Sequence, residues 1–282
     1  MKIALGTAQW GLDYGVSNTN GIPCNDELKS IFSIANKVGI NLYDTAVQYG
    51  SAEKRVGKYS TSKTKIVTKI GSFSERNSLE NQLDNSFKNL KRDNIYGCLF
   101  HDNKELIENK GLWRELSNYK KQGRISKIGY SLYEPSELFA LLGSGMLPDI
   151  LQIPYSILDR KFETHFGLLK NIGIEIHIRS VFLQGLYFKP LDELEPIYAD
   201  LKQSLKAIQL IGKKNNISVL ELALCFVLQN EFIDYAVLGV ETAYQLEQIF
   251  KASKQKISEK VIRETKSIKL ENYTMLNPVN WK

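Results

Sequence analysis

The chain alternates short apolar runs with longer segments whose apolar residues recur at helical spacing, and it does so eight times. A strand followed by a helix, repeated, predicts parallel pairing of the strands. Parallel strands are covered on both faces, so they are typically near-continuous apolar runs rather than alternating ones. The predicted strands are 3–5, 42–44, 65–69, 95–101, 127–131, 150–154, 175–180 and 235–239, and the predicted helices are 25–38, 51–59, 78–92, 106–122, 135–143, 158–171, 196–214 with 218–229, 242–252 and a last one at 257–269.

Eight strand–helix units in a chain of 282 residues fit an α/β fold of the (β/α)8 TIM-barrel type. The alternative is a doubly wound open sheet, which usually has a G-x-G-x-x-G turn after its first strand. Here the first turn is GTAQWGLDYG, which lacks that spacing. No linker rich in proline, glycine or serine divides the chain. We therefore predict one barrel domain over residues 1–282.

Composition argues against several classes of protein. No apolar run reaches the ~18 residues that a membrane helix needs, and the apolar N-terminal stretch is too short for a signal peptide, so the cytoplasm is expected. The net charge of +6 is spread over helical faces such as SLENQLDNSFKNLKR, which does not predict a nucleic-acid partner. Three cysteines and three histidines lie far apart in sequence, so no metal site is predicted.

Polar residues follow the predicted strands where a barrel would bring the strand ends together. Asp44, Lys69 and His101 end three consecutive strands, and Tyr49 follows Asp44 by one short turn. Each has an ordinary alternative, such as a helix cap for Asp44, but that residue lies too far before the helix near Ser51. A barrel brings all four to one rim, and we therefore predict a site there. Further along, Ser131, Gln152, Arg179 and Ser180 end the fifth, sixth and seventh strands.

These residue types predict acid–base chemistry on a carbonyl group. A buried Lys69 ammonium needs a partner, which Asp44 supplies. A cation beside Tyr49 is expected to lower the pKa of its phenol from about 10 towards neutrality. His101 is expected to orient a carbonyl oxygen towards that phenol. No serine or cysteine nucleophile with a base is part of this set, so the predicted attacking species is a hydride from a cofactor.

The chain resembles the aldo-keto reductases over nearly its full length. The blocks that carry the resemblance are YDTAVQYGSAEKRVGKY, KIVTKIG, LFHD, GYSLY, LQIPYS, the segment from Arg179 through GLY, and LGVETAYQLEQ. The resemblance implies a barrel that binds an extended nicotinamide cofactor. It also implies the catalytic set Asp44, Tyr49, Lys69 and His101, with Tyr49 as the proton donor.

The resemblance further implies cofactor-binding positions. Ser131 and Gln152 match positions that hold the nicotinamide carboxamide, and Arg179 stands where an aromatic residue often stacks on the ring. A guanidinium plane also stacks on rings, so that role is retained here as an expectation. The remaining implied positions are Thr7, Ser180, Phe182, Leu183, Gln184, Gly185, Gly239, Glu241, Gln245 and Gln248.

Further departures from the family pattern concern the cofactor. Gln245 stands where the family has an arginine, and Gln248-Ile249 stands where it has Glu-Asn for the adenine. Leu132 replaces an asparagine that usually follows the serine of the fifth strand. Glu241 stands where many members have a cation for a 2′-phosphate, and an acid suits a ribose diol better. The family default is NADP(H), and NAD(H) is the alternative.

Trp10 and Tyr14, in the loop after the first strand, are expected to wall the substrate pocket, and residues 184–196 are a candidate lid. The expected partner is a small carbonyl or alcohol substrate, and the oligomeric state is not predicted.

Two other functions stay open. One is a noncatalytic nucleotide-binding barrel that acts as a sensor or subunit. The other is a metal-dependent lyase, which would need more clustered carboxylate and histidine ligands than this chain offers.

Overall fold

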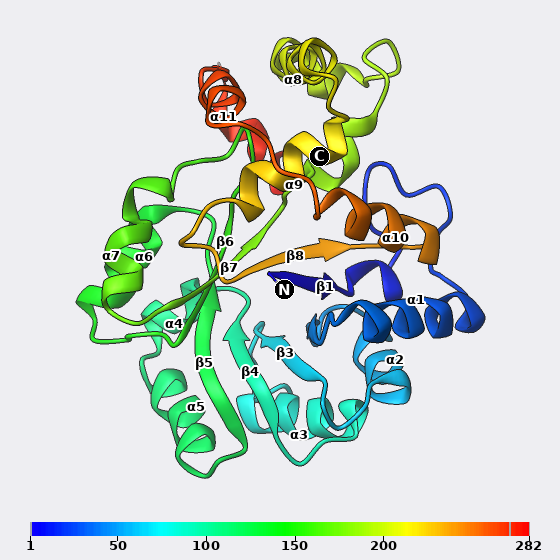
Figure 1. Ribbon diagram of the computed structural model, residues 1–282. Coiled ribbons are helices and arrows are strands. Elements are labelled where there is room, and N and C mark those ends of the chain that lie inside the picture. The colour runs from blue at the N-terminus through cyan, green and yellow to red at the C-terminus, as the bar shows by residue number, and fades with distance from the viewer. Residues whose placement is uncertain (1, 271, 282) are drawn as a thin grey trace.

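Eight parallel strands close into a barrel in chain order, as the ribbon in Figure 1 shows for the computed structural model, which describes residues 2–270 and 272–281. The expected (β/α)8 barrel is confirmed, although Met1, Glu271 and Lys282 of the expected domain lie outside the described residues. The strands are β1 (Ile3–Gly6), β2 (Leu42–Asp44), β3 (Lys65–Ile70), β4 (Ile95–Phe100), β5 (Ile125–Ser131), β6 (Ile150–Pro154), β7 (Glu175–Arg179) and β8 (Tyr235–Gly239).

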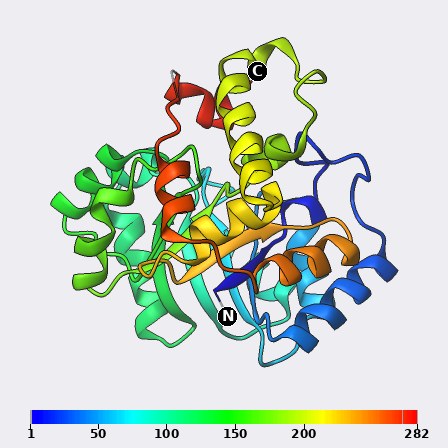
Figure 2. The ribbon, with the colours of Figure 1, turned by 45° about the horizontal axis from the view of Figure 1, so that its top comes forward.

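Helices surround the barrel, and α8 and α11 lie together with the C-terminal segment at one side of it, as Figures 1 and 2 both show. The α-helices are α1 (Asn25–Val38), α2 (Ala52–Tyr59), α3 (Leu79–Leu90), α4 (Lys104–Glu108), α5 (Gly111–Lys121), α6 (Pro135–Gly143), α7 (Phe166–Asn171), α8 (Lys202–Asn215), α9 (Val219–Leu228), α10 (Ala243–Ala252) and α11 (Glu259–Lys266). Short 3-10 helices are η1 (Ala8–Trp10), η2 (Glu163–His165), η3 (Leu183–Phe188), η4 (Pro196–Leu201), η5 (Tyr273–Leu276) and η6 (Pro278–Asn280).

The predicted helix 196–214 begins as the 3-10 helix η4 and is α-helical only from Lys202. Two other predicted helices differ from the structure because of side-chain hydrogen bonds. The segment 106–122 is divided into α4 and α5, because Asn109 leaves the helical conformation and its side-chain oxygen accepts the Gly111 N–H at 3.0 Å. The segment 158–171 becomes helical only from Glu163. Its first residues instead form a turn in which the Asp159 N–H donates to Ser156 Oγ at 3.1 Å. Side-chain hydrogen bonds to the backbone thus override the helical pattern in both places.

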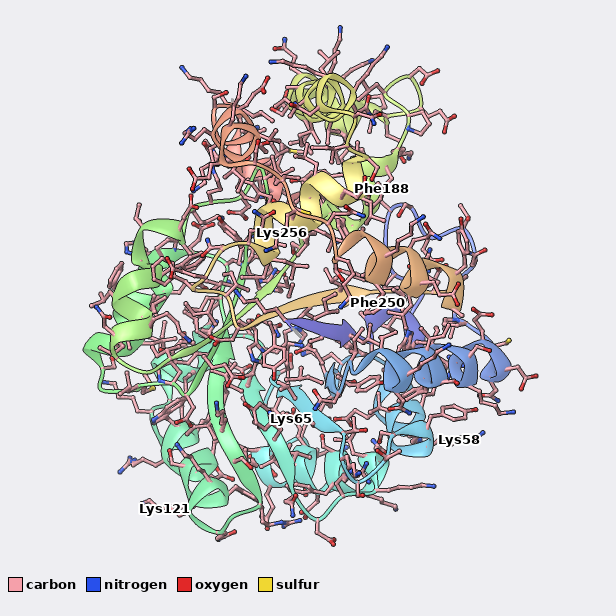
Figure 3. All side chains as sticks on the ribbon, viewed as in Figure 1. Lys58, Lys65, Lys121, Phe188, Phe250 and Lys256 are labelled. Atoms are coloured by element: carbon pink, nitrogen blue, oxygen red, sulfur yellow. The ribbon has the colours of Figure 1, made fainter. Side chains whose placement is uncertain are left out.

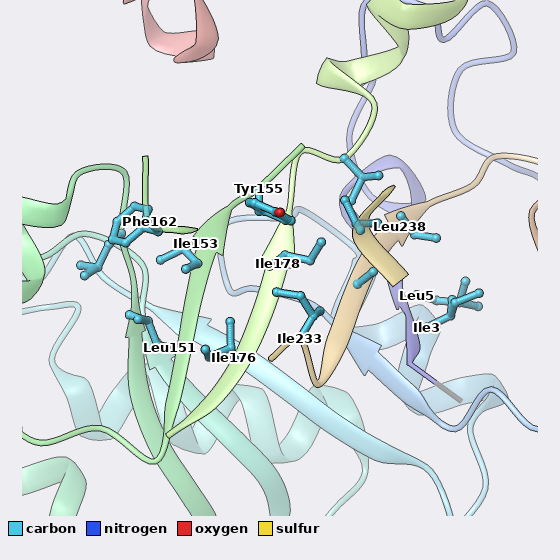
Figure 4. Packing of buried hydrophobic residues seen from close by; sticks show 14 of the residues in the cluster. Ile3, Leu5, Leu151, Ile153, Tyr155, Phe162, Ile176, Ile178, Ile233 and Leu238 are labelled. Atoms are coloured by element: carbon cyan, nitrogen blue, oxygen red, sulfur yellow. The ribbon is translucent and has the colours of Figure 1, made fainter. Parts of the chain in front are cut away.

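Apolar residues fill both sides of the barrel wall. A small inner cluster contains Val67, Leu99 and Ile150, whereas strand residues that point outward pack against the helices (Figure 4). Glycines make the inner layer possible, because a Cβ at Gly129 would lie 1.8 Å from the Ile150 carbonyl oxygen. Lysines such as Lys58 lie at the periphery instead (Figure 3). The tightly filled interior holds the strand ends in fixed relative positions.

The N-terminal end of the barrel contains a polar cluster around Glu175. Its carboxylate accepts a hydrogen bond from the Tyr96 hydroxyl at 2.8 Å, contacts His177 Nε2 at 2.7 Å, and pairs with Lys127. Burial raises the pKa of this carboxyl, but the hydrogen bonds from His177 and Lys127 lower it more, to about 2. The ionised carboxylate is therefore a stabilising partner in the folded state.

We expect Glu175→Gln to destabilise the fold by about 2 kcal/mol at neutral pH, a value discounted for partial exposure of the carboxylate. Because the folded-state pKa of Glu175 is depressed from 4.5 to about 2, the stability that it contributes is present above pH 4.5 and is lost as pH falls towards 2. Urea-unfolding midpoints of both proteins at several pH values measure this difference. The exposed Glu108→Gln is the matched control, and equal midpoints for Glu175→Gln and wild type at pH 7 would contradict the assignment.

Candidate active site

A cavity of about 550 Å³ opens at the C-terminal ends of the strands. It extends from the ends of β2 and β4 to the N-terminus of α10. Most of the predicted site residues line it, although they come from distant parts of the chain. The predicted residues on its wall are Thr7, Tyr14, Asp44, Tyr49, His101, Ser131, Gln152, Arg179, Ser180, Phe182, Gln184, Gly185, Gly239, Glu241, Gln245 and Gln248.

A buried ion pair forms the floor of this cavity. Lys69 is 1% exposed and its Nζ pairs with Asp44 Oδ1 and donates to the Thr45 carbonyl at 3.1 Å. The second Asp44 oxygen accepts a hydrogen bond from Gln152 Nε2 at 2.7 Å. Burial lowers the pKa of the Lys69 ammonium, but Asp44 and Tyr49 raise it more, so the net shift is upward. Lys69 is therefore charged and lies behind the cavity wall rather than on it.

Tyr49 lies directly above the ion pair in the turn after β2. Lys69 Nζ is 5.1 Å from the centroid of its ring, and the His101 ring meets it edge-on with centroids 5.7 Å apart. Gly11 allows the loop after β1 to press on this turn, since a Cβ at position 11 would lie 1.9 Å from the Tyr49 carbonyl oxygen. Loop packing thus fixes the phenol beside the cation.

The pKa of the Tyr49 phenol is raised rather than lowered, which corrects the expectation from sequence. Burial raises this pKa, and the opposite effect of the Lys69 charge is smaller. Sequence identifies the cation but not the degree to which the folded loop buries the half-buried Tyr49. As a result, Tyr49 holds its proton at neutral pH.

His101 follows β4 immediately and lies on the cavity wall. Burial, the charge of Lys69 and the charge of Arg179, in decreasing order, lower the pKa of its imidazole to about 3. The ring is therefore neutral at physiological pH. Its Nδ1 atom is buried and has no hydrogen-bond partner within the described protein. A neutral imidazole has one N–H donor, which can donate to a ligand oxygen beside the protonated phenol.

A strained segment after β7 forms another part of the wall. Ser180, Leu183 and Gln184 have left-handed φ values of 61°, 47° and 54°, which are costly for residues other than glycine. The Ser17 N–H and hydroxyl both donate to the Gln184 carbonyl at 3.3 Å and hold the segment. A Cβ at Gly185 would lie 1.7 Å from Ser17 Oγ, so this contact requires glycine.

The far end of the cavity lies at the N-terminus of α10. Gln245 Oε1 accepts the N–H groups of Glu241 and Thr242 at 2.7 and 3.2 Å and thereby caps the helix. Glu27 Oε1 accepts the Ala243 N–H at 2.5 Å. Among the described lining residues at this end, Glu241 carries the only charge, and it is negative.

Besides Lys69, two predicted site residues do not line the cavity. Trp10 is fully buried, packs against Phe32 and Tyr43, and donates its indole N–H to the Val240 carbonyl at 2.9 Å. The expectation that it walls the substrate pocket is therefore wrong, because η1 turns the ring into the core. The Leu183 side chain is likewise buried and does not line the cavity.

The structure also adds lining residues that sequence reasoning missed. Tyr133 belongs to the GYSLY block that contains Ser131, and Gln9 follows Thr7 by two residues. Their closeness in sequence to predicted site residues could therefore have identified both as lining residues. The sequence gives no such indication for Ser17 and Tyr244, because their position depends on how loops fold over the cavity. The main additions are Gln9, Ser17, Tyr133 and Tyr244.

Within residues 2–270 and 272–281, no cluster of three histidine, cysteine, aspartate or glutamate side chains is placed to hold a metal ion. In the same ranges, every helix is too short or too polar to cross a membrane.

The mouth of this barrel thus combines a buried lysine–aspartate pair, a tyrosine and a histidine. The sequence profile of the Aldo/keto reductase family matches residues 2–270. The chain therefore belongs to the aldo/keto reductase family, and it is an oxidoreductase. A search of curated proteins gave no match.

Solved structures of the same fold agree. The chain is 21% identical to an aldo-keto reductase from Bacillus halodurans in its holo form, with a TM-score of 0.77 and coverage of 95% of this chain and 91% of the other. It is 20% identical to a glycerol dehydrogenase from Gluconobacter oxydans, with a TM-score of 0.74 and coverage of 95% and 90%. At these identities the comparison shows a shared fold.

Proposed function

We propose that this protein transfers a hydride between a nicotinamide cofactor and a small carbonyl or alcohol substrate. One observation carries the proposal: a charged Lys69, held by Asp44, lies 5.1 Å from the ring centroid of a protonated Tyr49 at the cavity wall. A phenol beside a fixed cation is suited to give up a proton to an oxygen that gains negative charge.

The residues present fit a dinucleotide. The cavity wall includes both Tyr49 and residues at the N-terminus of α10, and the Gln9 amide packs on Gly239 where a Cβ would lie 2.3 Å from its nitrogen. When bound, the cofactor supplies or accepts the hydride. The residues that would hold it are Thr7, Ser131, Gln152, Ser180, Phe182, Gln184, Gly185, Gly239, Glu241, Gln245 and Gln248, which line the cavity.

The proton is the part of the chemistry that this chain supplies itself. Tyr49 donates its proton to the carbonyl oxygen, and the Lys69 ammonium stabilises the phenolate that results. Asp44 keeps Lys69 charged and in place through the buried pair. The neutral His101 orients the carbonyl oxygen towards the phenol. In the reverse direction the same phenolate takes the proton of an alcohol.

The charge at the α10 end favours NAD(H) over the family's default NADP(H). A 2′-phosphate would meet Glu241 there, whereas a ribose diol can donate to it. Glu241→Arg should therefore raise the ratio of kcat/KM for NADPH to that for NADH by at least about 10-fold. Glu247→Arg makes the same charge change on an exposed position of α10 outside the cavity wall, and it should leave the ratio unchanged. Equal ratios in both variants would refute the role of Glu241.

A panel of aldehydes, ketones and alcohols, run with NADH and with NADPH, tests the proposed function itself. Turnover that consumes cofactor in step with substrate supports it. Cofactor binding in a fluorescence titration without turnover of any substrate would instead support the noncatalytic nucleotide-binding barrel.

We also propose a cytoplasmic location, which suits the unpaired Cys24, Cys98 and Cys225.

A further inference from the structure

Arg179, the last residue of β7, presents a fixed guanidinium to the cavity. Its Cζ lies 4.0 Å from the centroid of the Tyr133 ring, and its Nη2 donates to the Leu132 carbonyl at 3.0 Å. Nε and Nη1 make long contacts of 3.4 Å with the hydroxyls of Ser131 and Ser180. These partners hold the guanidinium plane in one orientation.

All of these partners are neutral. Among the described residues, no carboxylate lies within 4.0 Å of Arg179. The cavity wall has two carboxylates, but Asp44 is committed to Lys69 and Glu241 lies at the α10 end. A guanidinium has five N–H donors on three nitrogens. Each nitrogen of Arg179 has one partner, so two of the five donors are unused. Burial raises the pKa of Asp159 to about 6 and the Arg179 charge opposes this shift, but Asp159 makes no ion pair with Arg179. A partly buried cation with no carboxylate in contact favours an anion from outside the chain.

The position of the charge decides which part of a ligand would meet it. The charge of Arg179 lowers the pKa of Tyr49, against the larger effect of burial, and also that of His101. Arg179 is therefore within electrostatic reach of the groups that face the reacting carbonyl. Tyr14 and Tyr133 add aromatic surface to the cavity wall near Arg179. An anionic group bound to Arg179 would therefore be part of the reacting molecule.

On this basis we propose that the substrate is an anionic carbonyl compound, in which a carboxylate or phosphate pairs with Arg179 while the carbonyl faces Tyr49. Planar pairing of a guanidinium with such a group provides two parallel hydrogen bonds. This inference rests on the proposed function and narrows its substrate class. Its rival is that Arg179 serves the cofactor, either by contact with its phosphates or by stacking on its ring.

The test uses aldehydes that differ only in charge: 3- and 4-carboxybenzaldehyde, each compared with its carboxamide. For wild type, kcat/KM is expected to favour the carboxylate by at least about 30-fold, mostly through KM. Arg179→Gln should reduce this preference to about 1, and Arg179→Lys should retain part of it. Lys58→Gln, which removes an exposed cation on α2, should leave the preference intact. A ratio between matched substrates cancels any effect that a substitution has on the cofactor.

Cofactor dissociation constants, measured by nicotinamide fluorescence, distinguish the proposed substrate role of Arg179 from a role in cofactor binding. If Arg179→Gln weakens cofactor binding while the carboxylate preference of wild type is absent or unchanged by the substitution, the inference is overturned. Calorimetry with benzoate and benzamide adds a readout without turnover. Preferential benzoate binding that is lost in Arg179→Gln supports the anion site even if no aldehyde is reduced, in which case only the proposed function fails. Reduction of neutral and charged aldehydes at equal rates leaves the function intact and overturns the anion site.

Discussion

Replacing Tyr49 with phenylalanine should lower kcat by about 1,000-fold, because the substitution removes the proton donor and little else. The ring stays, so its edge contact with His101 and its position near Lys69 are retained. The dissociation constant of the cofactor should change by less than about 2-fold. Steady-state absorbance of the reduced cofactor measures the first quantity, and fluorescence titration measures the second.

Tyr59→Phe is the matched control for this loss. It removes the same oxygen from a tyrosine whose hydroxyl is buried without a partner among the described residues and lies outside the cavity wall. Its kcat should equal that of wild type. If Tyr49→Phe retained wild-type turnover, Tyr49 would not be the proton donor.

Lys69→Met should combine a loss of activity with a loss of stability. Removing the ammonium leaves Asp44, which is 3% exposed, as a buried carboxylate without its counter-ion. Breaking a buried pair in this way typically costs about 3–5 kcal/mol, since the remaining charge stays desolvated. The phenolate of Tyr49 also loses the cation that stabilises it, so kcat should fall by at least about 100-fold.

The double variant Lys69→Met with Asp44→Asn separates these two effects. Asparagine keeps a side chain of the same shape beside Gln152 but carries no charge, so most of the lost stability should return. Activity should not return, because the cation is still absent. Urea-unfolding midpoints and kcat are measured on both variants. Recovery of both quantities in the double variant would mean that Lys69 has a structural role only.

The sequence predicts the barrel and the meeting of Asp44, Lys69 and His101 at its rim, and for one physical reason. Parallel strands in a barrel deliver their C-terminal ends to one rim, so Asp44, Lys69 and His101 had to meet once the strands were located. The strand boundaries themselves followed from apolar runs that both faces of the barrel bury. Position along the chain was therefore enough to place these side chains.

Side-chain direction and solvation were not predictable in the same way. Trp10 lies near the site in sequence, but η1 directs it into the core against Phe32. The pKa of Tyr49 depends on the balance between burial and one cation, and that balance requires the folded loop around it. The helix break at Asn109 comes from a single side-chain hydrogen bond that competes with a good helical pattern. In each case tertiary or local hydrogen-bonding context decided the outcome.

The pH dependence of single-turnover carbonyl reduction tests most directly whether the Tyr49 phenol is the acid. The pKa of Tyr49 is raised above its usual 10.0, so this acid is protonated at every lower pH, whereas the pKa of His101 is about 3. The rate should therefore be level from about pH 5 to about pH 9 and fall only as the phenol ionises. A rate that falls through about pH 6.5, where an ordinary histidine loses its proton, would contradict the account.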